Sequence, residues 1–164
     1  MKKKKKLTVF PDTNALLALI LFPVDAHGKL TLSGDVKALY DQGEFQLILS
    51  HVTVAELLEV LDREFPEHRG IAESFLKLYS HKLTRWPTPE EVAKVAPFAV
   101  DSDDAAIFAA AILSQPDIVL SNDFESFHHE KAKKLWASRK IQLESLYGLL
   151  CLFGKRERKS ELKQ

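Results

Sequence analysis

Short apolar segments alternate along this chain with longer segments that carry a helical pattern. This alternation strongly limits the possible folds, because a second parallel strand can follow a first only after a crossover, usually a helix. The helical pattern is clearest in residues 52–65, where Val54, Leu57, Leu58 and Leu61 share one face at i, i+3, i+4 and i+7. The alternation therefore predicts an α/β fold with a parallel sheet covered by helices on both faces.

The expected elements run through almost the whole chain. The expected strands are residues 7–10, 45–50, 82–86, 117–121 and 140–144. The expected helices are residues 15–21, 35–43, 52–65, 68–80, 88–95, 104–113, 126–138 and 145–153. No long linker divides these elements, so we expect one domain over residues 7–153, preceded by a basic start (residues 1–6) and followed by a polar, basic tail (residues 154–164).

Composition says little about partners and more about surroundings. Lysine plus arginine and aspartate plus glutamate number 23 each, so the zero net charge carries no general sign of nucleic-acid binding. The single cysteine, Cys151, excludes an internal disulfide and fits a reducing compartment. The apolar run near residue 20 is too short to span a bilayer, and Asp12 and Asn14 interrupt it in a way that a signal peptide does not allow. We therefore expect a cytoplasmic protein without a membrane segment.

Acidic residues recur at the ends of the expected strands. Asp12 follows the first strand and Asp123 follows the fourth. Glu56 lies early in the helix after the second strand, and Asp104 opens the apolar helix of residues 104–113. The carboxyl ends of parallel strands share one edge of a sheet, so these four acids could meet there. Clustered carboxylates raise each other's pKa, and Mg²⁺ or Mn²⁺ would relieve their repulsion.

Each acid also has a purely structural interpretation. Glu56 completes a capping-box pattern that starts at Thr53. The other acids lie in stretches typical of helix starts or turns, namely residues 12–14, 101–104 and 121–123. Taken singly, each residue fits such a role well. It is their coincidence at successive strand ends that favours a shared site.

The chain resembles the PIN-domain nucleases over nearly its whole length. The resemblance rests, in order, on "FPDTNALL", "TVAELLEVL", "DSDDAAIFAAAI" and "IVLSNDFESF". It implies that Asp12, Glu56, Asp104 and Asp123 bind a divalent metal, Mg²⁺ or Mn²⁺, and that Asn14 and Ser121 orient ligands or water. The stretch "DSDD" leaves Asp101 and Asp103 as additional candidates, and Glu125 could join from the loop after Asp123.

The same resemblance implies an architecture and an activity. The architecture is three-layered, α/β/α, with a central five-stranded parallel sheet. The activity is metal-dependent hydrolysis of RNA phosphodiester bonds by a metal-activated water. Many relatives are the toxin of a toxin–antitoxin pair, so the expected partners are an RNA substrate and an antitoxin protein, and we also consider a homodimer.

Residues beyond the last acid offer an RNA-facing edge. The segment "HHEKAKKLWASRK" is rich in basic residues, among them Lys131, Lys134 and Arg139, which we assign to RNA binding. Adjacent histidines on a helix point in different directions, so we interpret His128 and His129 as surface residues.

Two other functions compete with a ribonuclease. A phosphatase of the haloacid dehalogenase type would use Asp12 as nucleophile, but Asn14 stands where that chemistry needs an aspartate as general acid. A catalytically inactive PIN-like module that binds RNA or acts as a scaffold is the other alternative. The presence of all four expected acids argues against it.

Overall fold

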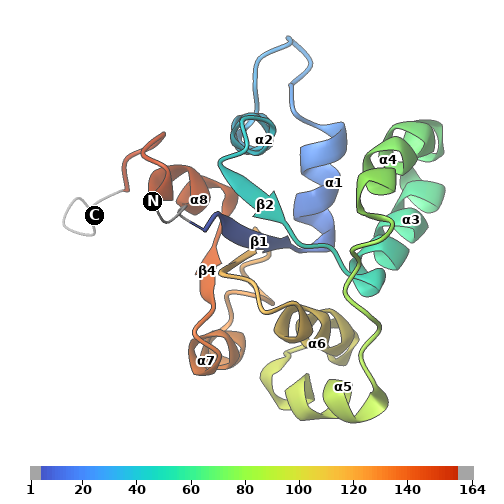
Figure 1. Ribbon diagram of the computed structural model, residues 1–164, viewed down its shortest axis with the longest axis vertical. Coiled ribbons are helices and arrows are strands. Elements are labelled where there is room, and N and C mark those ends of the chain that lie inside the picture. The colour runs from blue at the N-terminus through green and yellow to red at the C-terminus, as the bar shows by residue number, and fades with distance from the viewer. Residues whose placement is uncertain (1–4, 159–164) are drawn as a thin grey trace.

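A parallel sheet lies at the centre of the computed structural model, which describes residues 5–158 (Figure 1). Within these residues the sheet has four strands in the order β2-β1-β3-β4. The strands are β1 (Leu7–Pro11), β2 (Phe45–Leu47), β3 (Ile118–Leu120) and β4 (Gln142–Glu144). All three pairings are parallel, as the alternation of segments predicts.

Helices cover both faces of this sheet. They are α1 (Thr13–Leu21), α2 (Leu32–Asp41), α3 (His51–Glu64), α4 (Arg69–Leu76), α5 (Pro89–Val95), α6 (Ala105–Ser114), α7 (Glu130–Ser138) and α8 (Leu146–Leu152). Successive residues of β1 point to opposite faces. Val9 joins a core with α1, α2, α3, α4 and α8, whereas Phe10 joins a core with α5, α6 and α7. The expected three layers are therefore present (Figure 1).

The expectation of a five-stranded sheet is wrong by one strand in the described part of the chain. Residues 82–86 make only an isolated parallel bridge, between Thr84 and Ser50. Two features limit the pairing to this bridge. Ser50 already begins the turn into α3, and Pro87 has no N–H to extend a ladder. The sheet therefore ends at β2.

Differences also occur at the ends of two expected segments. The helix expected over residues 126–138 begins only at Glu130, because His129 is its N-cap and accepts a hydrogen bond from the N–H of Lys131. The described part of the expected basic tail lies against the domain, where Arg156 pairs with Asp35 at 2.9 Å and Arg158 pairs with Glu144 at 2.8 Å. The rest of the two basic ends, residues 1–4 and 159–164, lies outside the described residues.

No helix in residues 5–158 has the length and apolar character needed to cross a membrane.

The loop between α1 and α2 packs tightly on Gly34. A Cβ added to Gly34 would lie 1.9 Å from the backbone oxygen of Pro23. We expect Gly34→Ala to destabilise the fold by about 1–3 kcal/mol, since a backbone atom would have to move. Gly70→Ala in α4 is the control, because its Cβ would meet nothing within 4 Å. Urea unfolding gives the free energy of unfolding of wild type and both variants. If Gly34→Ala is as stable as wild type, the tight packing at Gly34 is contradicted.

Candidate active site

The carboxylate of Asp12 lies at the junction of β1, α1 and β3. Its backbone N–H donates to the carbonyl of Leu120 at 2.9 Å, which continues the pairing of β1 with β3. Its side chain caps α1 by accepting from the N–H of Ala15 at 2.7 Å, and it also accepts from the hydroxyl of Ser121. Asp12 is only 4% exposed. A carboxylate so deeply buried has to be held by specific donors.

Two serines link Asp12 to two further acids. The hydroxyl of Ser121 donates to Asp12 and accepts from the N–H of Asp123 at 3.0 Å. Ser126 then connects Asp123 to Asp104: its N–H donates to Asp123 at 3.1 Å and its hydroxyl donates to Asp104 at 2.7 Å. The structure thus brings Asp12, Asp123 and Asp104 into one chain of hydrogen bonds.

Glu56 reaches the same site from α3. The hydroxyl of Thr13, at the start of α1, donates to Glu56 at 2.6 Å. The N-cap of α3 is Ser50, which accepts from the N–H of Thr53 at 3.1 Å. The helix therefore begins before Thr53, and the capping-box interpretation of Glu56 is wrong. Its carboxylate is free to point towards α1.

The charges of the four acids act on one another. The pKa of Asp12 is raised to about 6: burial has the largest effect, the hydrogen bonds from Ser121 and Ala15 oppose it, and the carboxylates of Asp123 and Glu56 add to it. Burial, followed by the charge of Asp104, raises the pKa of Glu56. Burial, followed by the charges of Asp101 and Asp123, raises the pKa of Asp104. These mutual effects indicate that the four acids share one electrostatic environment at the carboxyl edge of the sheet.

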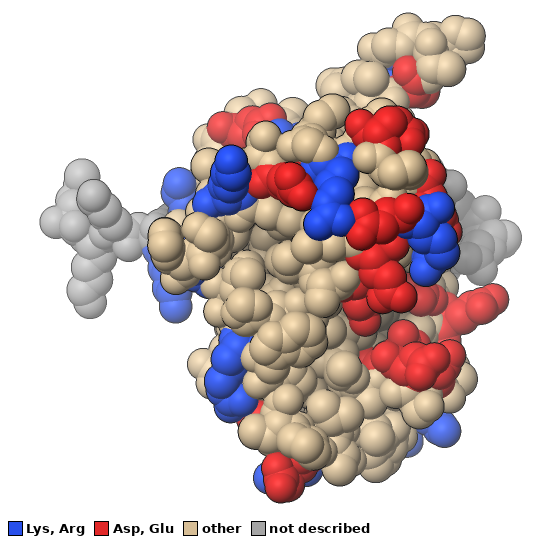
Figure 2. Space-filling model, turned by 90° about the vertical axis from the view of Figure 1, so that its right-hand side faces the viewer, with Lys and Arg blue, Asp and Glu red and all other residues tan. Residues whose placement is uncertain are grey.

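The surface formed by α3, α4, α5 and α6 also carries acidic side chains. Figure 2 faces the side formed by α3, α4, α5 and α6, and acidic side chains gather along one border of that view. Basic side chains lie among these acids in the same view, and Arg69 of α4 pairs with Asp62 and Glu73, so part of this negative charge is neutralised.

The donor set suits a hard divalent cation, because carboxylates and hydroxyls are oxygen ligands. The present arrangement is not yet that of a chelate: in residues 5–158, no group of three or more histidine, cysteine, aspartate or glutamate side chains is placed to hold one metal ion. Three of the four acids instead accept a hydrogen bond from a hydroxyl, of Thr13, Ser121 or Ser126. Small side-chain rotations that release these hydroxyls would be needed for the acids to converge on one ion.

The remaining candidates from the sequence are placed unequally. Asn14 is exposed and lines a small pocket of about 260 Å³ together with Asp123. Asp101 caps a short 3₁₀ turn by accepting from the N–H of Asp103 at 3.0 Å, and both residues are exposed. Glu125 is exposed in the turn after Asp123. Asn14 thus shares a pocket with Asp123, and Asp101 acts on Asp104 through its charge.

The three basic residues assigned to RNA binding do not lie together at the site. All are exposed. Helix α7 leads from the carboxyl edge of β3 back to the start of β4, which runs parallel to β3. Lys131 therefore lies near the acids, Lys134 lies midway, and Arg139 lies at the opposite edge of the sheet. This geometry separates Arg139 from the proposed RNA edge.

Sequence reasoning missed three residues that hold the site. Thr13 and Ser126 provide the hydroxyls for Glu56 and Asp104. His128, which we expected on the surface, is half-buried, and its Nε2 lies 2.7 Å from the carbonyl oxygen of Ser121. The position of Ser126, three residues after Asp123, was a usable signal, since aspartate often binds the N–H at that spacing. The contact of Thr13 with Glu56 had no local signal.

Fold and site together define a three-layer α/β protein with an acidic cluster at the carboxyl edge of its sheet. A family model described as "PIN domain" matches residues 8–125, a span that contains all four acids. The chain therefore belongs to the PIN domain family, whose members are in general nucleases, although some are inactive. Neither the curated proteins nor the solved structures contain a significant match to the chain.

We expect the ionised carboxylate of Asp12 to destabilise the folded chain. The pKa of Asp12 is about 6 in the folded chain against an ordinary value of 3.8, so the folded chain binds the proton more tightly. The stability that this proton contributes is present at low pH and lost as the pH rises from about 3.8 to about 6. At pH 7 without metal, Asp12→Asn should thus be more stable than wild type, by up to about 3 kcal/mol.

Urea unfolding at pH 4 and pH 7, in the presence of a chelator, tests this expectation. The advantage of Asp12→Asn should shrink at pH 4, where the wild-type carboxyl is largely protonated in the folded chain. Asp103→Asn is the matched control, since Asp103 is exposed. If Asp12→Asn is less stable than wild type at pH 7, the charge of Asp12 stabilises the fold and the expectation is wrong.

Proposed function

We propose that this protein is a metal-dependent endoribonuclease that uses Mg²⁺ or Mn²⁺ to hydrolyse phosphodiester bonds of RNA. One observation carries the proposal: four acids from separate parts of a PIN-domain chain act on one another at one edge of the sheet. Burial first, and neighbouring carboxylates second, raise the pKa of Asp12, Glu56 and Asp104, and a cation beside them would offset both effects.

Each side chain has a part in this proposal. Asp12, Glu56, Asp104 and Asp123 would hold the cation. Ser121 would keep Asp12 oriented through its hydroxyl, and Asn14 would orient a ligand or water from the pocket that it shares with Asp123. When bound, a divalent cation supplies activation of water and stabilisation of charge on the phosphate.

RNA as substrate, the role of toxin with an antitoxin partner, and a cytoplasmic location follow from the family resemblance. The phosphatase alternative is weakened by Asn14, which cannot act as a general acid, and by both oxygens of Asp12 accepting hydrogen bonds within the fold. The inactive module, in contrast, is expected to cut no RNA.

A pair of neighbouring aspartates provides the test. Asp104→Asn removes an acid that belongs to the hydrogen-bonded cluster, whereas Asp103→Asn removes an exposed acid one residue away. With Mn²⁺ or Mg²⁺, we expect wild type and Asp103→Asn to cut single-stranded RNA and Asp104→Asn to lose activity by about 100-fold or more. A gel assay with labelled RNA, with and without chelator, measures this.

Thermal unfolding of the same proteins separates metal binding from catalysis. Added Mn²⁺ should stabilise wild type and Asp103→Asn more than Asp104→Asn, because a ligand stabilises only as far as it binds the folded state. No cleavage by wild type, together with no response to metal, would favour the inactive module. Cleavage that survives chelator in all three proteins would overturn metal dependence.

A further inference from the structure

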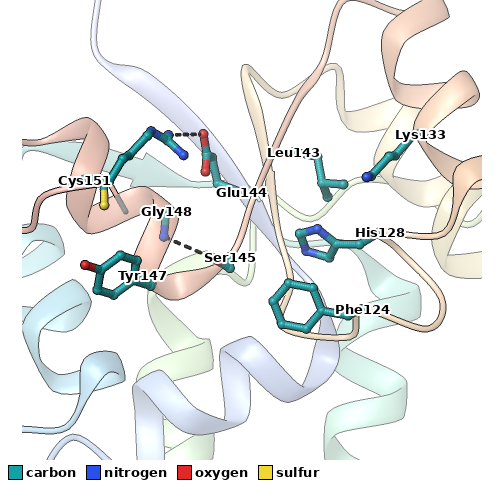
Figure 3. A pocket seen from close by; sticks show the side chains of 10 residues that line it. Phe124, His128, Lys133, Leu143, Glu144, Ser145, Tyr147, Gly148 and Cys151 are labelled. Carbon is teal, nitrogen blue, oxygen red and sulfur yellow. Dashed lines mark hydrogen bonds and ion pairs between the residues drawn. The ribbon is translucent and has the colours of Figure 1, made fainter. Parts of the chain in front are cut away.

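A pocket of about 690 Å³ opens beside the acidic cluster, between the loop after β3 and the start of α8 (Figure 3). One wall is Phe124, the residue directly after Asp123. The opposite wall comes from β4 and α8, with Glu144 and Gly148. None of the four acids assigned to the site lines this pocket. The residues that line this pocket are thus different from those that would hold the metal.

The pocket adjoins the acids through a shared strand-end loop. Asn122 and Asp123 line the smaller pocket that also contains Asn14. The side-chain oxygen of Asn122 accepts from the N–H of Leu146 at 2.8 Å, which fastens this loop to the start of α8. A chain that passed over the acids could therefore continue past Asn122 into the larger pocket.

An aromatic platform stands at the entrance. The ring of Phe124 is 62% exposed and packs on the ring of His128, with centroids 4.4 Å apart and planes inclined by 34°. His128 is in turn held at 2.7 Å by the carbonyl of Ser121. In Figure 3 both rings lie on the same side of the pocket. An exposed aromatic ring that is fixed relative to a strand end is suited to stacking a nucleobase.

The wall formed by β4 and α8 carries the buried carboxylate of Glu144. Glu144 is only 7% exposed, and its Oε1 accepts from Arg158 and Gln142, each at 2.8 Å. Its Oε2 packs against Gly148, where a Cβ would lie only 2.1 Å away. Any larger residue at position 148 would displace the carboxylate. The lack of a side chain at Gly148 therefore leaves room for the carboxylate in this wall.

Two basic side chains also line the pocket, and each has an acidic partner: Arg158 pairs with Glu144 at 2.8 Å, and Lys133 lies 3.6 Å from Glu130. The side chains of Lys133 and Arg158 are 51% and 60% exposed. They favour a ligand that carries a phosphate next to its polar, flat portion. A hydrophobic peptide would offer these two side chains no anionic partner.

We propose that this pocket binds a base of the RNA strand next to the cleaved phosphate, and that it prefers guanine. This inference rests on the proposed ribonuclease function. Phe124 stacks the base and Lys133 faces its phosphate, while Arg158 stays paired with Glu144. Glu144, when ionised, only accepts hydrogen bonds, and guanine presents N–H donors on two adjacent positions, N1 and N2. Adenine, cytosine and uracil each present donors at one position on that edge.

Binding of 5′-GMP, 5′-AMP, 5′-CMP and 5′-UMP, followed by NMR with chelator present, tests the pocket without cleavage. We expect 5′-GMP to bind wild type most tightly. Phe124→Ala should weaken all four nucleotides by about 5- to 150-fold, the usual effect of losing one stacked aromatic ring. Leu78→Ala is the control for an exposed apolar side chain far from the pocket, as Leu78 is 70% exposed.

Glu144→Gln tests the choice of base. It keeps the size of the side chain but replaces one acceptor with a donor, so the preference for 5′-GMP should disappear while stacking on Phe124 persists. Glu67→Gln, on an exposed 3₁₀ turn, is the control for a change of charge. The melting temperature of each variant verifies that it is folded, and Phe124→Ala tests the pocket even if Glu144→Gln does not fold.

The outcomes separate this inference from the proposed function. Preferential binding of 5′-GMP that depends on Phe124 supports the pocket even if the protein cuts no RNA. Two results would overturn the base pocket: wild type binds none of the four nucleotides, or wild type and Phe124→Ala bind them equally. If wild type still cuts RNA in either case, the proposed nuclease function stands. Tight binding of all four nucleotides that is unchanged in Glu144→Gln overturns the preference for guanine.

Discussion

The carboxylate of Asp12 is the group on which the arrangement of this site depends. It lies at the end of β1, which has β2 on one side and β3 on the other. Burying an ionisable group has a large free-energy cost unless donors hold it. Asp12 receives donors from Ala15 in α1 and from Ser121 after β3, and these two hydrogen bonds tie a helix start to a neighbouring strand end. The donors do not remove the whole cost, since the pKa of Asp12 stays raised at about 6.

Structural and functional interpretations of the acids are not exclusive. Asp12 is an N-cap and Asp123 accepts from the N–H of Ser126 in a turn, so both perform the structural role that their surroundings suggest. Glu56 and Asp104 do not. Glu56 is no part of the cap of α3, and Asp104 makes no side-chain cap bond to α6, yet both accept hydrogen bonds from hydroxyls of other segments. The contacts of these two acids therefore favour a shared site over a set of unrelated helix caps.

What the sequence could predict was local or periodic. The strand before Asp12 and the apolar helix after Asp104 follow from patterns within a few residues, and the parallel sheet follows from their alternation. Partners across the fold have no such signal, so the bonds of Thr13 to Glu56 and of His128 to Ser121 were missed. The expected strand at residues 82–86 had suitable residues, but pairing also depends on the neighbour, and Ser50 turns away into α3. Arg139 was misplaced because the charge pattern does not show which end of α7 faces the acids.

Charge is separated on a chain that is neutral as a whole. Four mutually repelling acids lie at the carboxyl edge, while Lys133 and Arg158 stand around the adjoining pocket. A phosphate backbone would be attracted by the basic side chains of the pocket and repelled by the acids. Under the proposed function, RNA can therefore approach the acids only when a cation lowers their negative charge. Metal binding and RNA binding would then favour each other by linkage, although the two occupy different side chains. The hydroxyls of Thr13, Ser121 and Ser126 would then have to release Glu56, Asp12 and Asp104 as that cation binds.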